Sequence, residues 1–135
     1  MKKLVTTITA IILVGSSALA LGPVTFQKHI NDDKSTRLVL ADSQGLSLYT
    51  FTPDKEGEST CYDACAQTWP PVLITEEIST QLTGILGSTK RRDGSLQLTV
   101  DSRPVYLFAA DRAAGDINGE GLGDVWFVID FNVKR

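Results

Sequence analysis

YTFTPDKEGESTCYDACAQTW, residues 49–69, holds both cysteines of the chain and one of its two tryptophans. A shift of 57 positions brings it onto YLFAADRAAGDINGEGLGDVW, residues 106–126. Only four of the 21 aligned positions are identical, but these positions contain six of the ten aromatic residues. The matched pairs are Tyr49 and Tyr106, Phe51 and Phe108, Asp54 and Asp111, and Trp69 and Trp126. The pattern predicts a two-copy repeat, with copies at about residues 37–85 and 86–131.

The start of the chain has the features of an export signal. Lys2 and Lys3 are followed by an apolar run at residues 4–14 and by a small-x-small cleavage site at 18–20. Polar residues interrupt the run, so it falls short of the roughly 20 apolar residues that span a bilayer. We therefore expect a signal peptide at 1–20 and a single exported domain at 21–135, either periplasmic or secreted. Because no cysteine lies near the cleavage site, we expect no stable membrane anchor after cleavage.

The charge of the predicted mature chain argues against two classes of partner. Removal of residues 1–20 takes away two of the 13 basic residues and leaves 11 against 16 acidic ones, a net charge of −5. Nucleic acid and anionic membrane surfaces would both be repelled by this field. We expect instead an envelope component or a small ligand as partner.

Short runs of alternating residues predict a mainly β fold. Residues 24–26, 37–40, 46–51 and 125–131 read as strands, and Asp93-Gly94 predicts a hairpin turn between strands at 88–92 and 95–100. Helical segments are predicted at about 62–67 and after Thr75, whose side chain can cap a helix. We therefore expect short antiparallel strands, in two pseudo-repeats packed into one small domain, with one or two short helices.

The cysteine pair has two interpretations. Two cysteines in an exported protein usually form a disulfide, and the spacing of Cys61 and Cys65 allows a local one. The alternative is a redox or copper-handling pair. Copper sites of this kind use histidine and methionine as further ligands, yet the chain has only His29, and its one methionine is Met1.

The matched aromatic residues also have two interpretations. Alternation along strands predicts that the tyrosines and phenylalanines are core, that Trp69 and Trp126 pack near them, and that Asp54 and Asp111 cap the turns that follow. The same rings could instead line a ligand groove between the copies or form an electron relay.

Two other segments are weaker candidates. Residues 116–124 place Asp116, Asn118, Glu120 and Asp124 like ligands of a calcium loop, but Phe127 stands where a bidentate glutamate is expected. A surface loop is the default interpretation, and no cofactor is predicted. Residues 90–92, Lys-Arg-Arg, alternate faces on a strand and are expected to be solvated.

Several separate motifs resemble the bacterial secreted repeat family, predicted lipoproteins with a Y-x4-D or Y-x-(F/W/Y)-x-x-D motif. The resemblance covers about residues 37–130 and includes LVLADSQGLSLYTFTPD, STCYDACAQTWPP, RRDGSLQLTVDSRPVYLFAAD and GDINGEGLGDVW. It implies an exported protein built from paired repeats, with no established activity. Where the family usually has glycine between its cysteines this chain has Asp63, and aspartate tolerates a left-handed backbone.

Three functions stay open on the sequence. The favoured one is a non-enzymatic envelope or periplasmic module that binds a ligand through the aromatic cluster. The second is redox or metal handling by Cys61 and Cys65. The third is an enzyme of unknown type, although the linear order marks no carboxylate pair and no nucleophile motif.

Overall fold

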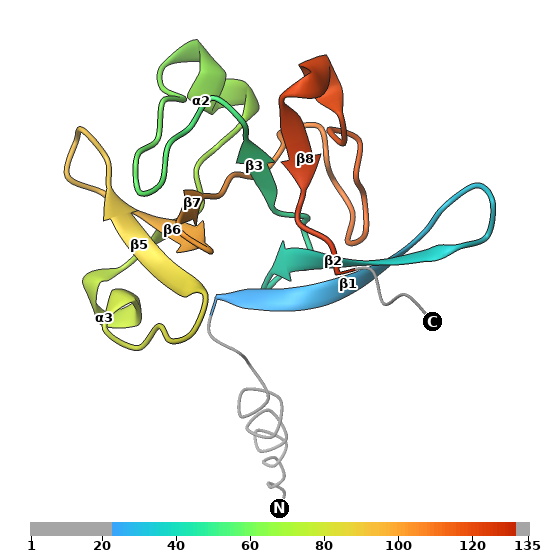
Figure 1. Cartoon of the computed structure of the whole chain (residues 1–135), viewed down its shortest axis with the longest axis horizontal. Helices are drawn as coiled ribbons and strands as arrows, with labels where there is room; N and C mark the ends of the chain where they lie inside the picture. The colour runs from blue at the N-terminus through green and yellow to red at the C-terminus, as the bar shows by residue number, and fades with distance from the viewer. Residues whose placement is uncertain (1–22, 132–135) are drawn as a thin grey trace, which may run out of the picture.

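Short strands are the main regular elements of the computed structural model, which describes residues 23–131 (Figure 1). The predicted signal peptide lies outside these residues. In chain order the elements are β1 (Val24–Ile30), β2 (Thr36–Asp42), β3 (Tyr49–Phe51), α2 (Ala64–Thr68), β4 (Leu73–Ile74), α3 (Glu76–Ser79), β5 (Leu86–Lys90), β6 (Leu96–Val100), β7 (Arg103–Pro104), the 3-10 turn η2 (Leu122–Asp124) and β8 (Trp126–Val128). The predicted mainly β class, with short antiparallel strands and two short α-helices, is confirmed.

Two hairpins of the same kind occur in the described chain, one before β3 and one before β7. β1 pairs with β2, and β5 pairs with β6, both antiparallel. At the two tips, Asp33 Oδ1 accepts from the Ser35 backbone N–H, and Asp93 Oδ1 accepts from the Ser95 N–H, each at 2.9 Å. The strands have seven residues in the first hairpin and five in the second, so the copies differ in length but share one turn.

Two of the three sheets in the described residues contain strands from both copies. β8, from the second copy, pairs with β3 of the first in the register Tyr49↔Val128. β4, from the first copy, pairs with β6 of the second in the register Leu73↔Gln97. Figure 1 shows β8, near the end of the chain, lying beside β3. The two copies therefore interlock through these two sheets.

The core has an aliphatic part and an aromatic part. The aliphatic cluster consists of Val24, Leu40, Leu48, Val72, Leu98, Val100 and Val105. The aromatic cluster contains the matched tyrosines and tryptophans of both copies, together with Val39, Cys61 and Val128, and Phe51 and Phe108 lie at its margin. Tyr49 and Phe51 thus share the face that the period of a strand predicts.

The structure confirms one local prediction and corrects two others. The Thr75 Oγ1 accepts the backbone N–H of Ile78 at 3.1 Å, so the predicted cap of α3 is confirmed. The strand predicted at 125–131 is shorter, since β8 ends at Val128. The expectation that residues 90–92 are solvated is wrong for Arg91, which is only 7% exposed, because its guanidinium finds hydrogen-bond acceptors inside the protein.

The interlocking predicts that the protein stays whole after a cut between its copies. A protease site introduced at the exposed residues 83–85 separates β1–β4 from β5–β8. The disulfide lies within the first fragment, so only packing and strand pairing hold the fragments together. We expect both fragments to co-elute with the uncut protein in native size-exclusion chromatography and to separate in denaturant. Separate elution under native conditions would show that each copy closes by itself.

Candidate functional site

Four rings from the matched positions form one stacked column in the order Phe51, Trp126, Trp69, Phe108. The indoles of Trp69 and Trp126 lie nearly parallel, with ring centroids 3.9 Å apart and an angle of 3° between their planes. Phe51 stacks on Trp126 at 4.2 Å, and Phe108 stacks on Trp69 at 4.3 Å. Each phenylalanine therefore stacks on the tryptophan of the other copy. The side chains thus pair between the copies, as the strands β3 with β8 and β4 with β6 do.

The two matched tyrosines meet at the centre of the exchange. The backbone N–H of Tyr49 donates to the Tyr106 carbonyl at 2.8 Å, and the Tyr106 N–H donates to the Tyr49 carbonyl at 2.9 Å. This reciprocal pair places a pseudo-twofold axis between them. Their rings then point edge-on to the indole column, Tyr49 to Trp69 and Tyr106 to Trp126, each with centroids 5.2 Å apart.

Each tyrosine donates its phenolic proton to the aspartate of the other copy. The Tyr49 Oη donates to Asp111 Oδ2 and the Tyr106 Oη donates to Asp54 Oδ2, both at 2.6 Å. Both tyrosine side chains are fully buried, and the aspartates are 5% and 7% exposed. The tyrosine and aspartate of one Y-x4-D motif are therefore not bonded to each other. The tyrosine of each motif is instead bonded to the aspartate in the motif of the other copy.

The other oxygen of each aspartate organises the loop that follows it. Asp54 Oδ1 accepts from the Thr60 backbone N–H at 2.8 Å, and Asp111 Oδ1 accepts from the Asn118 N–H at 2.9 Å. The predicted turn-capping role of both aspartates is thus present in the structure. A carboxylate that receives charge-assisted hydrogen bonds on both oxygens tolerates burial.

The surroundings of the phenols favour their neutral form. Burial, and then the hydrogen bond to Asp111, raises the pKa of the Tyr49 phenol well above its ordinary value of 10. Burial, and then the bond to Asp54, raises the pKa of Tyr106 in the same direction. Both phenols consequently keep their protons throughout the neutral and mildly alkaline range.

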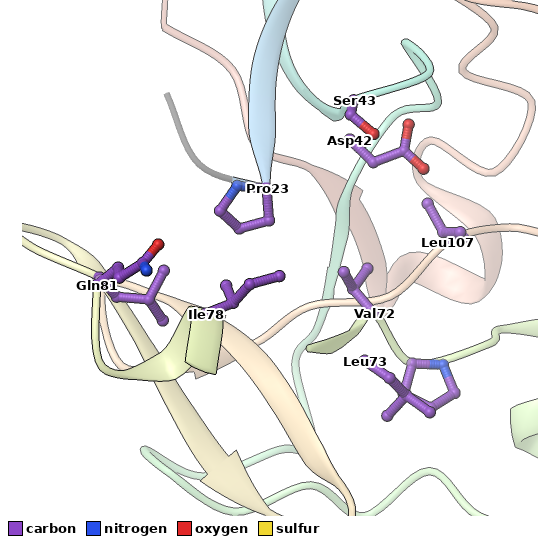
Figure 2. A pocket seen from close by; sticks show the side chains of 10 residues that line it. Pro23, Asp42, Ser43, Val72, Leu73, Ile78, Gln81 and Leu107 are labelled. Atoms are coloured by element: carbon purple, nitrogen blue, oxygen red, sulfur yellow. The ribbon is translucent and has the colours of Figure 1, made fainter. Parts of the chain in front are cut away.

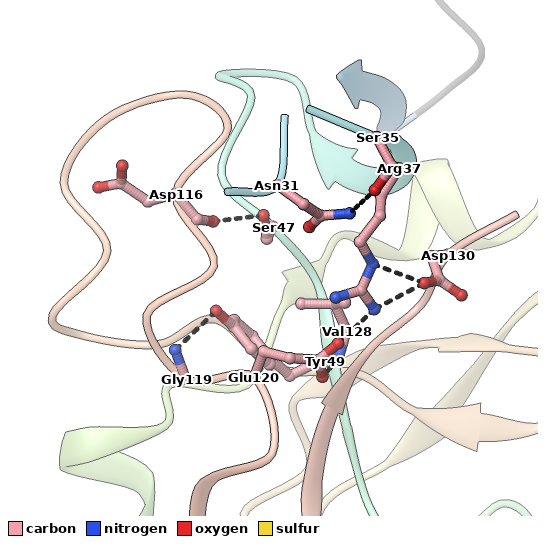
Figure 3. Close-up of polar contacts among 10 residues, drawn as sticks. All are labelled: Asn31, Ser35, Arg37, Ser47, Tyr49, Asp116, Gly119, Glu120, Val128 and Asp130. Carbon is pink, nitrogen blue, oxygen red and sulfur yellow. Dashed lines mark hydrogen bonds and ion pairs between the residues drawn. The ribbon is translucent and has the colours of Figure 1, made fainter. Parts of the chain in front are cut away.

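The loop after Asp111 closes over the column. Gly119 donates its backbone N–H to the Tyr49 Oη at 3.1 Å (Figure 3). A Cβ atom at Gly119 would lie 2.6 Å from Trp69 Cη2 and 3.0 Å from Phe108 Cδ2. Glycine is required here by close approach to the rings, so this loop forms the lid of the aromatic core.

The predicted disulfide between Cys61 and Cys65 is formed, with an S–S distance of 2.03 Å. Cys61 is fully buried against the aromatic cluster. Asp63, between them, has a positive φ of 54°, as its place in the resembled family's glycine position predicts. The disulfide therefore fixes the loop that carries α2 and belongs to the core.

Arg91 is a buried cation, and the sequence did not predict its burial. Its Nη1 donates to Ser59 Oγ at 3.0 Å and Gln97 Oε1 at 2.8 Å, and its Nη2 donates to the Cys61 carbonyl at 2.8 Å. Ser59 Oγ in turn lies 2.5 Å from the Tyr106 Oη. Two hydroxyl groups therefore connect the buried guanidinium to the buried carboxylate of Asp54.

The calcium-loop candidates are held by other partners. Glu120 accepts from Arg37 and from the Val128 backbone N–H (Figure 3). Asp116 Oδ2 accepts from the backbone N–H groups of Arg112 and Ala113, in its own loop. Asn118 and Asp124 do not join them: within residues 23–131, no three His, Cys, Asp or Glu side chains gather as metal ligands would. His29 Nδ1 lies 3.0 Å from the Gly115 carbonyl. Calcium and copper binding stay predictions that the structure does not test.

A hollow beside α3 is the feature that sequence reasoning missed. Its volume is about 550 Å³, and its lining is mainly apolar, from Pro23, Pro71, Val72, Leu73, Ile78, Leu82 and Leu107, with Asp42, Ser43 and Gln81 as polar groups. Figure 2 shows Asp42 and Ser43 on one side of this space and Ile78 and Gln81 on another. We call this space the α3 hollow. Its walls come from residues far apart in sequence, so no local motif signals it.

A family model described as a secreted repeat of unknown function matches the chain twice, at residues 32–73 and 87–130. The two matches together cover more than half of the chain. The protein belongs to this secreted repeat family. No curated protein and no solved structure matches it. Within the described part of the chain, no helix is long and apolar enough to be a membrane span.

The matches place the repeat's framework and the α3 hollow in different parts of the chain. All eight residues of the aromatic and aspartate motif lie inside the matched segments. Ile78, Gln81 and Leu82 lie between the two segments, and Pro23 lies before the first. The motif residues of the core therefore lie within the matched segments, whereas part of the hollow's wall lies outside them.

Substitution of Gly119 tests the lid. For Gly119→Ala we expect a loss of about 1–3 kcal/mol in the free energy of unfolding, because the new methyl group overpacks Trp69 and Phe108. Gly87→Ala is the matched control, since its Cβ meets only the Thr99 Oγ1 at 3.0 Å, on a side chain that can rotate. Chemical denaturation measures both. Equal losses in the two variants would contradict the proposed role of Gly119.

The raised phenol pKa values predict a specific alkaline instability. The unfolded chain loses its phenolic protons near pH 10, while the folded chain keeps those of Tyr49 and Tyr106. Their contribution to the free energy of unfolding is therefore complete below about pH 10 and falls as the pH rises above it. Denaturant titrations across this range should show the fall in the native protein and in Tyr62→Phe. The double variant Tyr49→Phe/Tyr106→Phe should lose it, and an unchanged fall there would contradict the assignment.

Proposed function

We propose that this secreted repeat protein is a non-enzymatic binding module that holds a small ligand in the α3 hollow. The observation that supports this is the hollow itself, whose volume lies in the range of small-molecule sites and whose lining is mainly apolar with few polar groups. A ligand groove at the aromatic cluster has less support, because the tyrosines and tryptophans are at most 5% exposed. The two tyrosine hydroxyls already have partners, Asp111 for Tyr49 and Asp54 for Tyr106.

The position of α3 explains why one copy carries this hollow. α3, at Glu76–Ser79, lies between the two segments that the family model matches, 32–73 and 87–130. We call residues 75–85 the connector. Ile78, Gln81 and Leu82 of the connector line the hollow together with Pro23 and Val72. Figure 2 shows Ile78 and Gln81 beside Pro23. The pseudo-twofold symmetry of the core is thus broken at the place where we propose that a ligand binds.

The polar groups indicate the chemistry of the ligand. Asp42 Oδ1 accepts from the backbone N–H groups of Gln44 and Leu46, at 2.9 and 3.0 Å. Within the described residues this orients the carboxylate and leaves Oδ2 for a hydrogen-bond donor. The ligand class that fits is an apolar body with an amine or hydroxyl head, since apolar walls favour the body and the carboxylate favours the donor.

The cysteine pair supports a structural role. The disulfide is closed and Cys61 has no exposed surface, so a redox partner has no direct approach to that sulfur. Reactive cysteines lie in partly exposed, electropositive surroundings. Cys61 is fully buried, so it lacks the required exposure. We therefore attribute no separate redox function to the pair.

Fluorescence of N-phenyl-1-naphthylamine, an apolar probe with one N–H donor, tests the α3 hollow. We expect saturable binding to the native protein and an affinity at least about tenfold lower for Ile78→Trp, which fills the hollow, a loss of about 1.4 kcal/mol. Ile85→Trp is the matched control, because Ile85 is in the same connector, is 50% exposed and does not line the hollow.

A second pair of measurements tests the role of the carboxylate. Asp42→Asn should weaken binding of the same probe, and the anionic analogue 1-anilinonaphthalene-8-sulfonate should bind the native protein more weakly than the N-phenyl amine does. Binding of the amine that is unaffected by Ile78→Trp would place the site elsewhere and contradict the proposal.

A further inference from the structure

The buried phenol and carboxylate pairs take no part in the α3 hollow, and their arrangement suits a different chemistry. Two tyrosines, each bonded to an aspartate, flank two stacked indoles within one cluster. A core needs apolar packing, which phenylalanine would supply without two buried carboxylates. The question is what a phenol, a carboxylate and an indole in contact can do together.

Indoles and phenols are the side chains of this core that most readily lose an electron. The single methionine is Met1, in the predicted signal peptide, and both cysteines are joined in a disulfide. Phenylalanine is far harder to oxidise. Phe51 and Phe108, at the two ends of the column, are therefore not oxidised with the indoles. The Trp69 and Trp126 rings, parallel at 3.9 Å, can share one positive charge between them.

Each tyrosine is in position to donate an electron to an oxidised indole. The ring centroids of Tyr49 and Trp69, and of Tyr106 and Trp126, lie 5.2 Å apart, which is contact distance for electron transfer. A phenol that loses an electron becomes a strong acid and must give up its proton. The acceptor is already in place for both phenols, since each Oη lies 2.6 Å from an aspartate Oδ2.

We propose that this cluster is a one-electron donor site for high-potential outer-sphere oxidants that the exported protein meets. The oxidant takes one electron from the Trp69–Trp126 pair and is reduced. One electron then moves from Tyr49 or Tyr106 to the indole radical cation, and the phenolic proton moves along the existing hydrogen bond to Asp111 or Asp54. The products are the reduced oxidant, a restored indole, a neutral tyrosyl radical and a protonated carboxyl group.

This donor activity is independent of ligand binding in the α3 hollow, which lies on a different set of residues. The resting state favours it in one further respect: the raised phenol pKa values keep both protons on oxygen until an electron leaves. Proton and electron therefore leave the tyrosine together, and bulk water does not need to reach the buried ring.

Photogenerated tris(bipyridine)ruthenium(III), an outer-sphere one-electron oxidant, tests the site in the full-length mature protein. Electron paramagnetic resonance and transient absorption should show a neutral tyrosyl radical in the native protein. In Tyr49→Phe/Tyr106→Phe this signal should be lost and a tryptophanyl signal should replace it. Tyr62→Phe is the matched control, because Tyr62 lies outside the column between Arg91 and Arg92, and its tyrosyl signal should equal that of the native protein.

The proton step has its own test. Formation of the tyrosyl signal in the native protein should be slower in D2O than in H2O, and Asp54→Asn/Asp111→Asn should lower its yield severalfold. Near-UV circular dichroism checks the packing of each variant, and the isotope measurement needs no variant at all. A tyrosyl signal that disappears in Tyr62→Phe, or that forms equally fast in D2O, would overturn the proposal.

Discussion

The exchange of hydrogen bonds between Tyr49 and Tyr106 is the constraint on which the rest of the structure depends. Two segments from different copies meet there through their backbones, and each phenol donates a hydrogen bond to the aspartate of the opposite copy. If each tyrosine bonded its own aspartate, the copies would be independent units with separate cores. Because the bonds cross, Trp69 and Trp126, at the ends of the two loops, are also brought together. The four rings then stack into one column.

The two halves of the exchange neutralise their buried charges differently. Around Tyr106, the Asp54 carboxylate is linked through hydroxyl groups to the buried Arg91. Around Tyr49, the loop supplies backbone N–H groups instead. Arg37, in the same copy as Tyr49, forms ion pairs with Glu120 and Asp130 nearer the surface (Figure 3). A symmetrical framework therefore tolerates asymmetrical electrostatics, provided that each carboxylate keeps hydrogen bonds on both oxygens.

The sequence predicts the elements of this framework better than their connections. Identity at Tyr, Phe, Asp and Trp marks the repeat, and Asp93-Gly94 and Thr75 mark a turn and a helix start, because these signals are local. No local signal shows that Tyr49 bonds Asp111 rather than Asp54, since both aspartates stand at the same place in their copies. The burial of Arg91 depends on acceptors at Ser59, Gln97 and the Cys61 carbonyl, which only the folded chain brings together.

The position of β8 has a consequence for the order in which the chain folds. The place beside β3 is filled by residues near the end of the sequence, and the pairing of Tyr49 with Val128 closes a loop of most of the described chain. Contacts between such distant residues form slowly. The β3–β8 sheet therefore cannot form until the last strand of the described chain is available. The interlocking that joins the two copies in the final structure thus also makes the completion of the first copy depend on the end of the second.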